Sequence, residues 1–152
     1  MGNRSMRKLI LAGVIAAFGF AGTGIAQAQT ADAVIAARKA GLQLLSSAAG
    51  SLKRTVDAKA EVKPLKGTAD AIVAWAAAFP GLFPAGSDKG NTKVAPEAFS
   101  DRPGFEKAAM ALGDAAKKLS AAADANDATA FAAAFGEVGA ACGGCHRTYR
   151  QR

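Results

Sequence analysis

Both cysteines and the only histidine of this chain lie in one pentapeptide, Cys142-Gly143-Gly144-Cys145-His146. Cys-x-x-Cys-His is the pattern through which a c-type haem is attached to a protein. On a helix, this spacing puts the thiols on neighbouring turns of one face, where they reach the two vinyl groups on one porphyrin edge. The imidazole that follows lies beside the ring and binds iron as the proximal ligand. The motif therefore predicts one covalent haem c, held by Cys142 and Cys145, with His146 on the metal.

Three other uses of the motif stay open. A redox dithiol has the same Cys-x-x-Cys spacing, but it usually follows a strand of a βαβ unit, and no strand pattern is found here. A zinc site would lack its fourth ligand, because the chain offers only two cysteines and one histidine. A disulfide across so short a loop would be strained inside a helix. Haem attachment is the interpretation that the motif favours.

The N-terminus has the pattern of a secretory signal peptide. Arg4, Arg7 and Lys8 precede an almost uninterrupted apolar or small run over residues 9–25, and Ala26-Gln27-Ala28 matches a cleavage site. A membrane anchor is the alternative, but the apolar run is short and rich in glycine for a membrane span. We expect residues 1–28 to be removed and residues 29–152 to form one periplasmic domain without membrane attachment. Free thiols do not persist in such an oxidising compartment, so we expect both cysteines to be covalently bonded there.

The charge of the mature chain argues against a nucleic-acid partner. Loss of the three cations in the signal peptide lowers the formal net charge from +7 to +4. The two haem propionates would lower it by about two more, because carboxylates are ionised at neutral pH. The lysines and arginines also do not cluster with aromatic residues as they do in a nucleic-acid-binding groove.

Alanine dominates the mature sequence, and no alternating run indicates a strand, so the fold class is all-α. Apolar residues recur at helical spacing in four segments, which predict an antiparallel up-down-up-down four-helix bundle with covalently bound haem. The predicted segments are about 32–59, 65–79, 101–123 and 127–149. Asp32, Ser100 or Asp101, and Asp127 are the predicted helix caps. The stretch from Pro80 to about Ser100 is predicted to be a long irregular loop that packs on something through its apolar residues.

Arg38 interrupts an apolar stripe on the first predicted helix. The stripe consists of Ile35, Arg38, Leu42, Leu45, Ala49, Leu52 and Val56. Either the long Arg38 stem brings the charge to the surface, or the guanidinium meets a carboxylate supplied by a cofactor, for which a haem propionate is the favoured candidate. Trp75 and Met110 are predicted to be packing residues, and the Tyr149 hydroxyl is predicted to reach a polar partner.

The haem motif stands at the C-terminal end of a predicted four-helix bundle, and this combination resembles the cytochrome c′ family of class II c-type cytochromes. The resemblance covers the whole mature chain. It is most specific in residues 118–125 and 132–140, which lead into the haem motif and Tyr149-Arg150, and in the loop residues Phe83, Gly86-Ser87, Thr92-Lys93 and 96–99.

The resemblance implies roles for individual residues. Arg38 would contact a propionate, with Lys39 beside it where many members carry glutamine. Thr92 and Lys93 would lie at the haem edge, Phe83 would pack on the ring, and Arg150 would lie near the proximal side of the iron. Members of the family are commonly homodimers that associate through their first two helices.

Leu42 matches the distal position of the family, on the same helix face as Arg38. Low-spin relatives of the cytochrome c556 type carry methionine there as a sixth ligand, whereas leucine has no lone pair to offer. The resemblance therefore implies five-coordinate, high-spin iron that binds NO or CO in a hydrophobic pocket. An electron carrier, with a periplasmic redox partner docking at the haem edge, is the alternative. No catalytic residues are predicted, since the distal side offers no acid–base pair for a peroxidase, and we expect a protein that is not an enzyme.

Overall fold

The computed structural model describes residues 30–152, so the predicted signal peptide lies outside the described residues. Its helices, with 3-10 helices labelled η, are α1 (Ala31–Asp57), η1 (Lys63–Leu65), α2 (Lys66–Ala78), η2 (Phe79–Leu82), α3 (Glu97–Ser100), α4 (Arg102–Asp124) and α5 (Ala128–Tyr149). The only β-type pairing recorded in this range is an isolated bridge between Val94 and Arg150.

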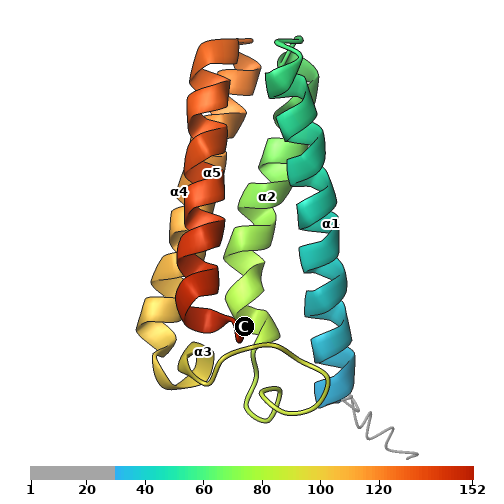
Figure 1. Ribbon diagram of the computed structural model, residues 1–152, viewed down its shortest axis with the longest axis vertical. Helices are drawn as coiled ribbons and strands as arrows, with labels where there is room; N and C mark the ends of the chain where they lie inside the picture. Colours follow the sequence, from blue (N-terminus) through green and yellow to red (C-terminus); the bar gives the residue numbers. More distant parts are fainter. Residues whose placement is uncertain (1–29) are drawn as a thin grey trace, which may run out of the picture.

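The four long helices alternate in direction and form an up-down-up-down bundle, as the sequence predicts (Figure 1). α4 packs extensively against both α2 and α5, whereas the helix contacts of α1 are mainly with α5 and η2. The α1–α2 and α4–α5 turns lie at one end of the bundle. The irregular segment 83–96, α3 and the C-terminus lie together at the other end (Figure 1).

Side-chain caps fix where three of the four long helices begin. Asp101 accepts a hydrogen bond from the Gly104 N–H, and Asp127 accepts from the N–H groups of Thr129 and Ala130, as predicted. The predicted cap at Asp32 is wrong. Thr30 precedes the helix with extended backbone, and its hydroxyl accepts from the Ala33 N–H at 3.3 Å, while Asp32 lies in the first turn. Both residue types satisfy free N–H groups, and the extended backbone of Thr30 decides between them.

The turn end of the bundle is tied together by Asn126. Its backbone is left-handed, with φ of 52°, and its side-chain oxygen accepts from the N–H groups of Val62 and Lys63 at 3.2 and 3.1 Å. Asparagine tolerates this conformation better than most residues. The α4–α5 turn is thereby joined to the α1–α2 connection.

The predicted apolar stripes form the core. A main cluster between the helices includes Leu52, Leu119 and Phe131, each fully buried. A second cluster at the loop end consists of Phe83, Val94, Ala98 and Phe105. On α2 and α4 the apolar residues at helical spacing are buried or half-buried. The prediction that Met110 packs is wrong. Met110 is 61% exposed on α4, because it lies off the stripe that faces α2 and α5.

The segment predicted to be irregular is more ordered than expected, since it contains η2 at one end and α3 at the other. The short α3 was missed because four residues carry too little periodicity, and it is held by the fully buried Ala98. The same segment is fastened to the end of α5. The Ala95 N–H donates to the Tyr149 carbonyl at 3.0 Å, and the Gln151 N–H donates to the Lys93 carbonyl at 2.8 Å.

Among the described residues, α5 alone has the length and mean hydropathy, 1.2, of a helix that could cross a membrane. This is weak support for a span. In this fold the helix packs against α4, and its apolar composition comes from its alanines, two phenylalanines, one valine and two cysteines.

Candidate haem site

Cys142, Cys145 and His146 occupy the last two turns of α5, so the motif is helical as predicted. Both cysteines are half-buried and free, and Cys142 packs against the main core cluster, while His146 is exposed. The structure therefore gives the disulfide alternative no support. The dithiol alternative also lacks its usual context, because the motif follows no strand in the part of the chain that the structure describes.

The surroundings raise the pKa of both thiols and lower the pKa of the imidazole. Burial raises the pKa of Cys142, and burial together with the neighbouring Cys142 raises the pKa of Cys145. Burial lowers the pKa of His146, and the positive charge of Arg150 lowers it further. A neutral imidazole has a nitrogen lone pair free for a metal, which is the form that binds iron.

Arg38 is buried in the loop end of the bundle, with 2% of its surface exposed. One terminal nitrogen donates to Ser87 Oγ at 3.0 Å and to the Leu82 carbonyl at 3.4 Å. The other donates to the Ser87 carbonyl and to Thr92 Oγ1, the latter at 2.8 Å. The expectation that the charge might reach the surface is therefore wrong.

The guanidinium of Arg38 also lies over the Phe83 ring, 4.7 Å from its centroid. Burial lowers the pKa of Arg38 and the charge of Asp88 opposes the shift, but an arginine keeps its charge under such conditions. The loop thus compensates a buried cation with neutral acceptors and an aromatic face. The predicted propionate contact is not tested by these bonds and stays a prediction.

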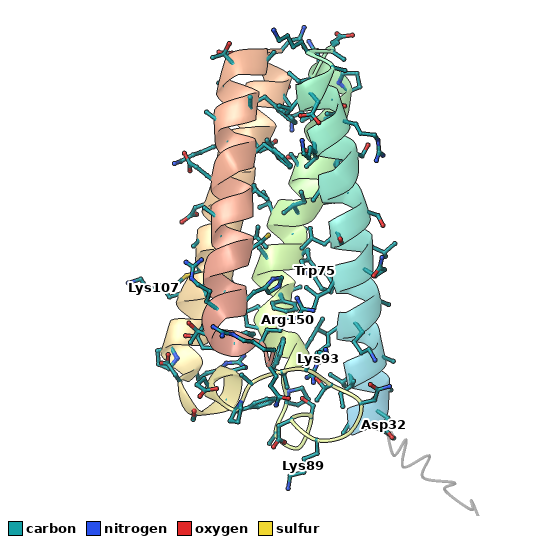
Figure 2. The ribbon with its side chains drawn as sticks, viewed as in Figure 1. Asp32, Trp75, Lys89, Lys93, Lys107 and Arg150 are labelled. Carbon is teal, nitrogen blue, oxygen red and sulfur yellow. The ribbon has the colours of Figure 1, made fainter. Side chains whose placement is uncertain are left out.

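The other predicted site residues lie around Arg38 at this end of the molecule. Thr92 accepts from Arg38 and from the Val94 N–H, and the exposed Lys39 donates to the Asn91 carbonyl at 3.3 Å. The side chains of Lys93 and Arg150 are exposed and lie at the same end (Figure 2), where the Val94–Arg150 bridge joins their segments. Sequence reasoning missed Ser87 as the main acceptor for Arg38. Little in the sequence indicates this contact, because Ser87 is a loop serine 49 positions after Arg38.

Leu42 and Trp75 lie on the helices next to this network. Leu42 follows Arg38 by one turn of α1 and is 36% exposed. Trp75 reaches from α2 toward α1 (Figure 2) and lies against Gly41. Its indole N–H is buried, without an acceptor among the described residues. A buried tryptophan N–H usually has a partner, so this donor is suited to an acceptor brought by a bound group.

The donor set fits a c-type haem. Two unbridged thiols on one helix face, with an imidazole next to them, are the groups through which a protein holds a covalent porphyrin, and the buried Trp75 N–H is a donor without an acceptor among the described residues. Lys39, Lys93 and Arg150 are exposed cations. Within residues 30–152 no group of three or more His, Cys, Asp or Glu side chains is placed to hold a metal ion directly. The zinc alternative therefore gains no support.

Comparison with known proteins decides the family. The family model described as Cytochrome C′ matches residues 33–150. The chain belongs to the cytochrome c′ family. It is 35% identical to the cytochrome c′ of Alcaligenes xylosoxydans xylosoxydans over 117 residues, which are 76% of this chain and 91% of that protein. It is 32% identical to the cytochrome c′ of Allochromatium vinosum over 141 residues, 90% of this chain and 92% of the other.

Solved structures of cytochromes c′ have the same fold. The structure from Thermochromatium tepidum matches with a TM-score of 0.75 and 31% identity, covering 81% of this chain and 98% of that one. Two variants of the Alcaligenes xylosoxidans protein match similarly. One is a ferrous variant with bound NO, with a TM-score of 0.73, 31% identity and coverage of 81% of this chain and 97% of that one. The other is a leucine-to-glycine variant with bound carbon monoxide, with a TM-score of 0.74, 31% identity and coverage of 81% and 98%.

Family membership confirms the predicted cofactor, because cytochromes c′ bind a c-type haem covalently. It also confirms the fold class. The family consists of haem proteins that carry electrons or bind small gases. The roles of the individual site residues are proposals, and they follow.

Proposed function

We propose that this cytochrome c′ has five-coordinate, high-spin iron and binds NO or CO on a hydrophobic distal side covered by Leu42. The observation that carries the proposal is the position of Leu42, one turn beyond the buried Arg38 on α1. The NO and CO complexes of the Alcaligenes xylosoxidans relative support it. The haem, when bound, supplies the iron that takes up the gas.

The side chains around the haem would have separate tasks. Cys142 and Cys145 would fix the porphyrin to α5, and His146, whose pKa is lowered by burial and by Arg150, would be the axial ligand. Leu42 would keep water and anions from the iron, because an isobutyl group offers neither a hydrogen bond nor a charge.

The loop would form the wall of the haem site on the propionate side. Arg38 orders this loop, because its guanidinium donates to Thr92 and lies over the ring of Phe83. We infer that Lys39 and Lys93 neutralise the propionates, since both are exposed cations at this end of the bundle.

The position of Met110 disfavours the alternative of a low-spin electron carrier. Such a carrier needs a fixed sixth ligand, and Met110 is the only methionine of the predicted mature chain. It is 61% exposed on α4, while Leu42, the proposed distal residue, lies on α1. A methionine facing solvent has no route to the iron without rearranging the helix that carries it.

We also propose that residues 1–28 are a cleaved signal peptide and that the domain of residues 29–152 works in the periplasm. The basic start, the apolar run and the Ala26-Gln27-Ala28 site support this. Export would also bring the two free cysteines to an oxidising compartment, where haem attachment gives them a stable fate. Mass spectrometry of protein recovered from a periplasmic extract tests both points, and an N-terminus at Met1 would contradict them.

Absorption spectra of the purified protein test the proposed function. We expect the ferrous protein to show the broad bands of high-spin haem and to change when CO is added. Leu42→Met is the matched comparison, because it places a thioether at the proposed distal position and should sharpen the ferrous bands. A sharp low-spin α-band in the wild type, unchanged by CO, would show a native sixth ligand and support the electron carrier instead.

A further inference from the structure

Trp75 of α2 lies directly on the backbone of α1 at Gly41. A methyl group added at Gly41 would stand 2.7 Å from Trp75 Cζ2 and closer still to Cη2 and Cζ3. Real side chains do not approach so closely, so the six-membered ring of the indole occupies the space that any other residue at position 41 would need. Gly50, the other glycine of α1, is open by comparison, with its nearest neighbour, Arg54 Nη1, at 3.7 Å.

This contact lies beside the proposed distal residue. Leu42 is the next residue after Gly41, and Arg38 lies one turn before it on the same helix. α1 is therefore held at two neighbouring points, by the hydrogen bonds of Arg38 to the loop and by the indole of Trp75 on Gly41. A helix moves as a stiff unit over one turn, so a change at Gly41 displaces Leu42.

We propose that the Gly41–Trp75 contact sets how closely Leu42 covers the iron, and that this pair is therefore a determinant of gas binding. The inference rests on the proposed function, because it assigns to Leu42 the distal side. Adding a methyl group at residue 41 forces either the indole out of its place or α1 away from α2. In both cases the Leu42 side chain loses its position, and the barrier to an entering gas falls.

Rates of CO association with the ferrous haem-containing protein test this effect. Gly41→Ala should raise the rate by about tenfold, the change that 1.4 kcal/mol of barrier produces. Gly50→Ala is the matched control on the same helix and should leave the rate within about twofold, since its methyl group meets no close neighbour. Trp75→Phe shortens the ring and removes the contact, so this variant alone should also bind CO at a rate different from that of the wild type. In that background, Gly41→Ala should change the rate by less than about twofold.

The thermal unfolding midpoints of the same variants test the Gly41–Trp75 contact independently of gas binding. Alanine favours a helix more than glycine does, so Gly50→Ala should raise the unfolding midpoint. Gly41→Ala should lower the midpoint in the wild type and raise it in Trp75→Phe. This reversal of sign requires a steric conflict between residues 41 and 75.

The outcomes separate the inference from the function on which it rests. A wild-type ferrous protein that does not bind CO overturns the proposed function and the inference with it. CO binding in the wild type, with the same rate in Gly41→Ala and in Trp75→Phe, overturns the inference alone. If Gly41→Ala fails to retain haem while the double variant retains it, the contact is supported. In that case the rate of CO association with Trp75→Phe tests whether the contact controls gas binding. A rate equal to that of the wild type overturns the inference.

Discussion

At the scale of single residues, Arg38 is a buried cation whose side-chain acceptors, Ser87 and Thr92, come from the loop at the same end of the bundle. The sequence shows that a charge interrupts an apolar stripe. It does not show that the charge meets Ser87 and Thr92, since these lie 49 and 54 positions away and are brought near by the fold. The role of Ser87, with no exposed surface, could be found only from the structure.

Attachment by the two thiols gives the first testable expectation. In Cys142→Ala/Cys145→Ala, acid–acetone should extract the haem, while in the wild type the haem should stay with the protein. The reason is that thioether bonds survive this treatment and axial ligation does not. The pyridine haemochrome spectrum of the two fractions measures the outcome. Haem that remains bound to the double variant would contradict the covalent assignment.

Replacement of Arg38 should loosen the loop over residues 83–96. Arg38→Leu removes the donors to Ser87 and Thr92, and we expect a loss of roughly 2–4 kcal/mol, since a bond to a charged group contributes about 1.5–3 kcal/mol. Urea denaturation measures this loss, and hydrogen exchange of the loop amides localises it. Ser87→Ala, which removes one acceptor, should have a smaller effect in the same place. A reduction potential that shifts in Arg38→Leu but not in Ser87→Ala would support the propionate contact.

At the scale of helices, the periodic apolar stripes and the caps at Asp101 and Asp127 were predictable because they depend on residues a few positions apart. The contact between Asp70 of α2 and Ser120 of α4 was not. Ser120 Oγ donates to Asp70, and Lys66 donates to the other carboxylate oxygen at 2.8 Å. These bonds, that from Lys66 above all, lower the pKa of Asp70.

The lowered pKa of Asp70 makes its contribution to stability depend on pH. A carboxyl whose pKa is lower in the folded state stabilises the fold above its unfolded pKa, and this stabilisation is lost as the pH falls through the folded pKa. Asp70→Asn should therefore unfold at a lower temperature than the wild type at pH 7, and the difference should vanish in strong acid. Asp57→Asn, which breaks an exposed pair with Lys53 within α1, should have less effect. An equal difference at every pH would contradict this role.

At the scale of the whole molecule, the bundle was predictable because each stripe needs a partner face and the three main connections join successive antiparallel helices. The oligomeric state was implied only by the family resemblance. We propose a homodimer through α1 and α2. Leu44 on the outside of α1 is 71% exposed and supports this, since a large apolar side chain is better accommodated in an interface than in water.

The proposed dimer is tested at Leu44. Leu44→Asp should shift the wild-type dimer toward monomer, because a buried unpaired carboxylate opposes association. Analytical ultracentrifugation measures the molecular mass, and Met110→Asp, at an exposed position on α4, is the matched control. A monomeric wild type, or equal association in Leu44→Asp, would contradict the interface.

The hydrogen bonds between the loop and the end of α5 have a consequence for how the protein is made. The loop carries the acceptors of Arg38, yet its backbone is fastened by Tyr149 and Gln151. Tyr149 and Gln151 lie at and just beyond the end of α5, so the loop can be fastened only after the chain has been synthesised through α5. The backbone bonds that fasten the loop around Arg38 therefore form after all four long helices have been made, and a chain that stops before Tyr149 lacks them.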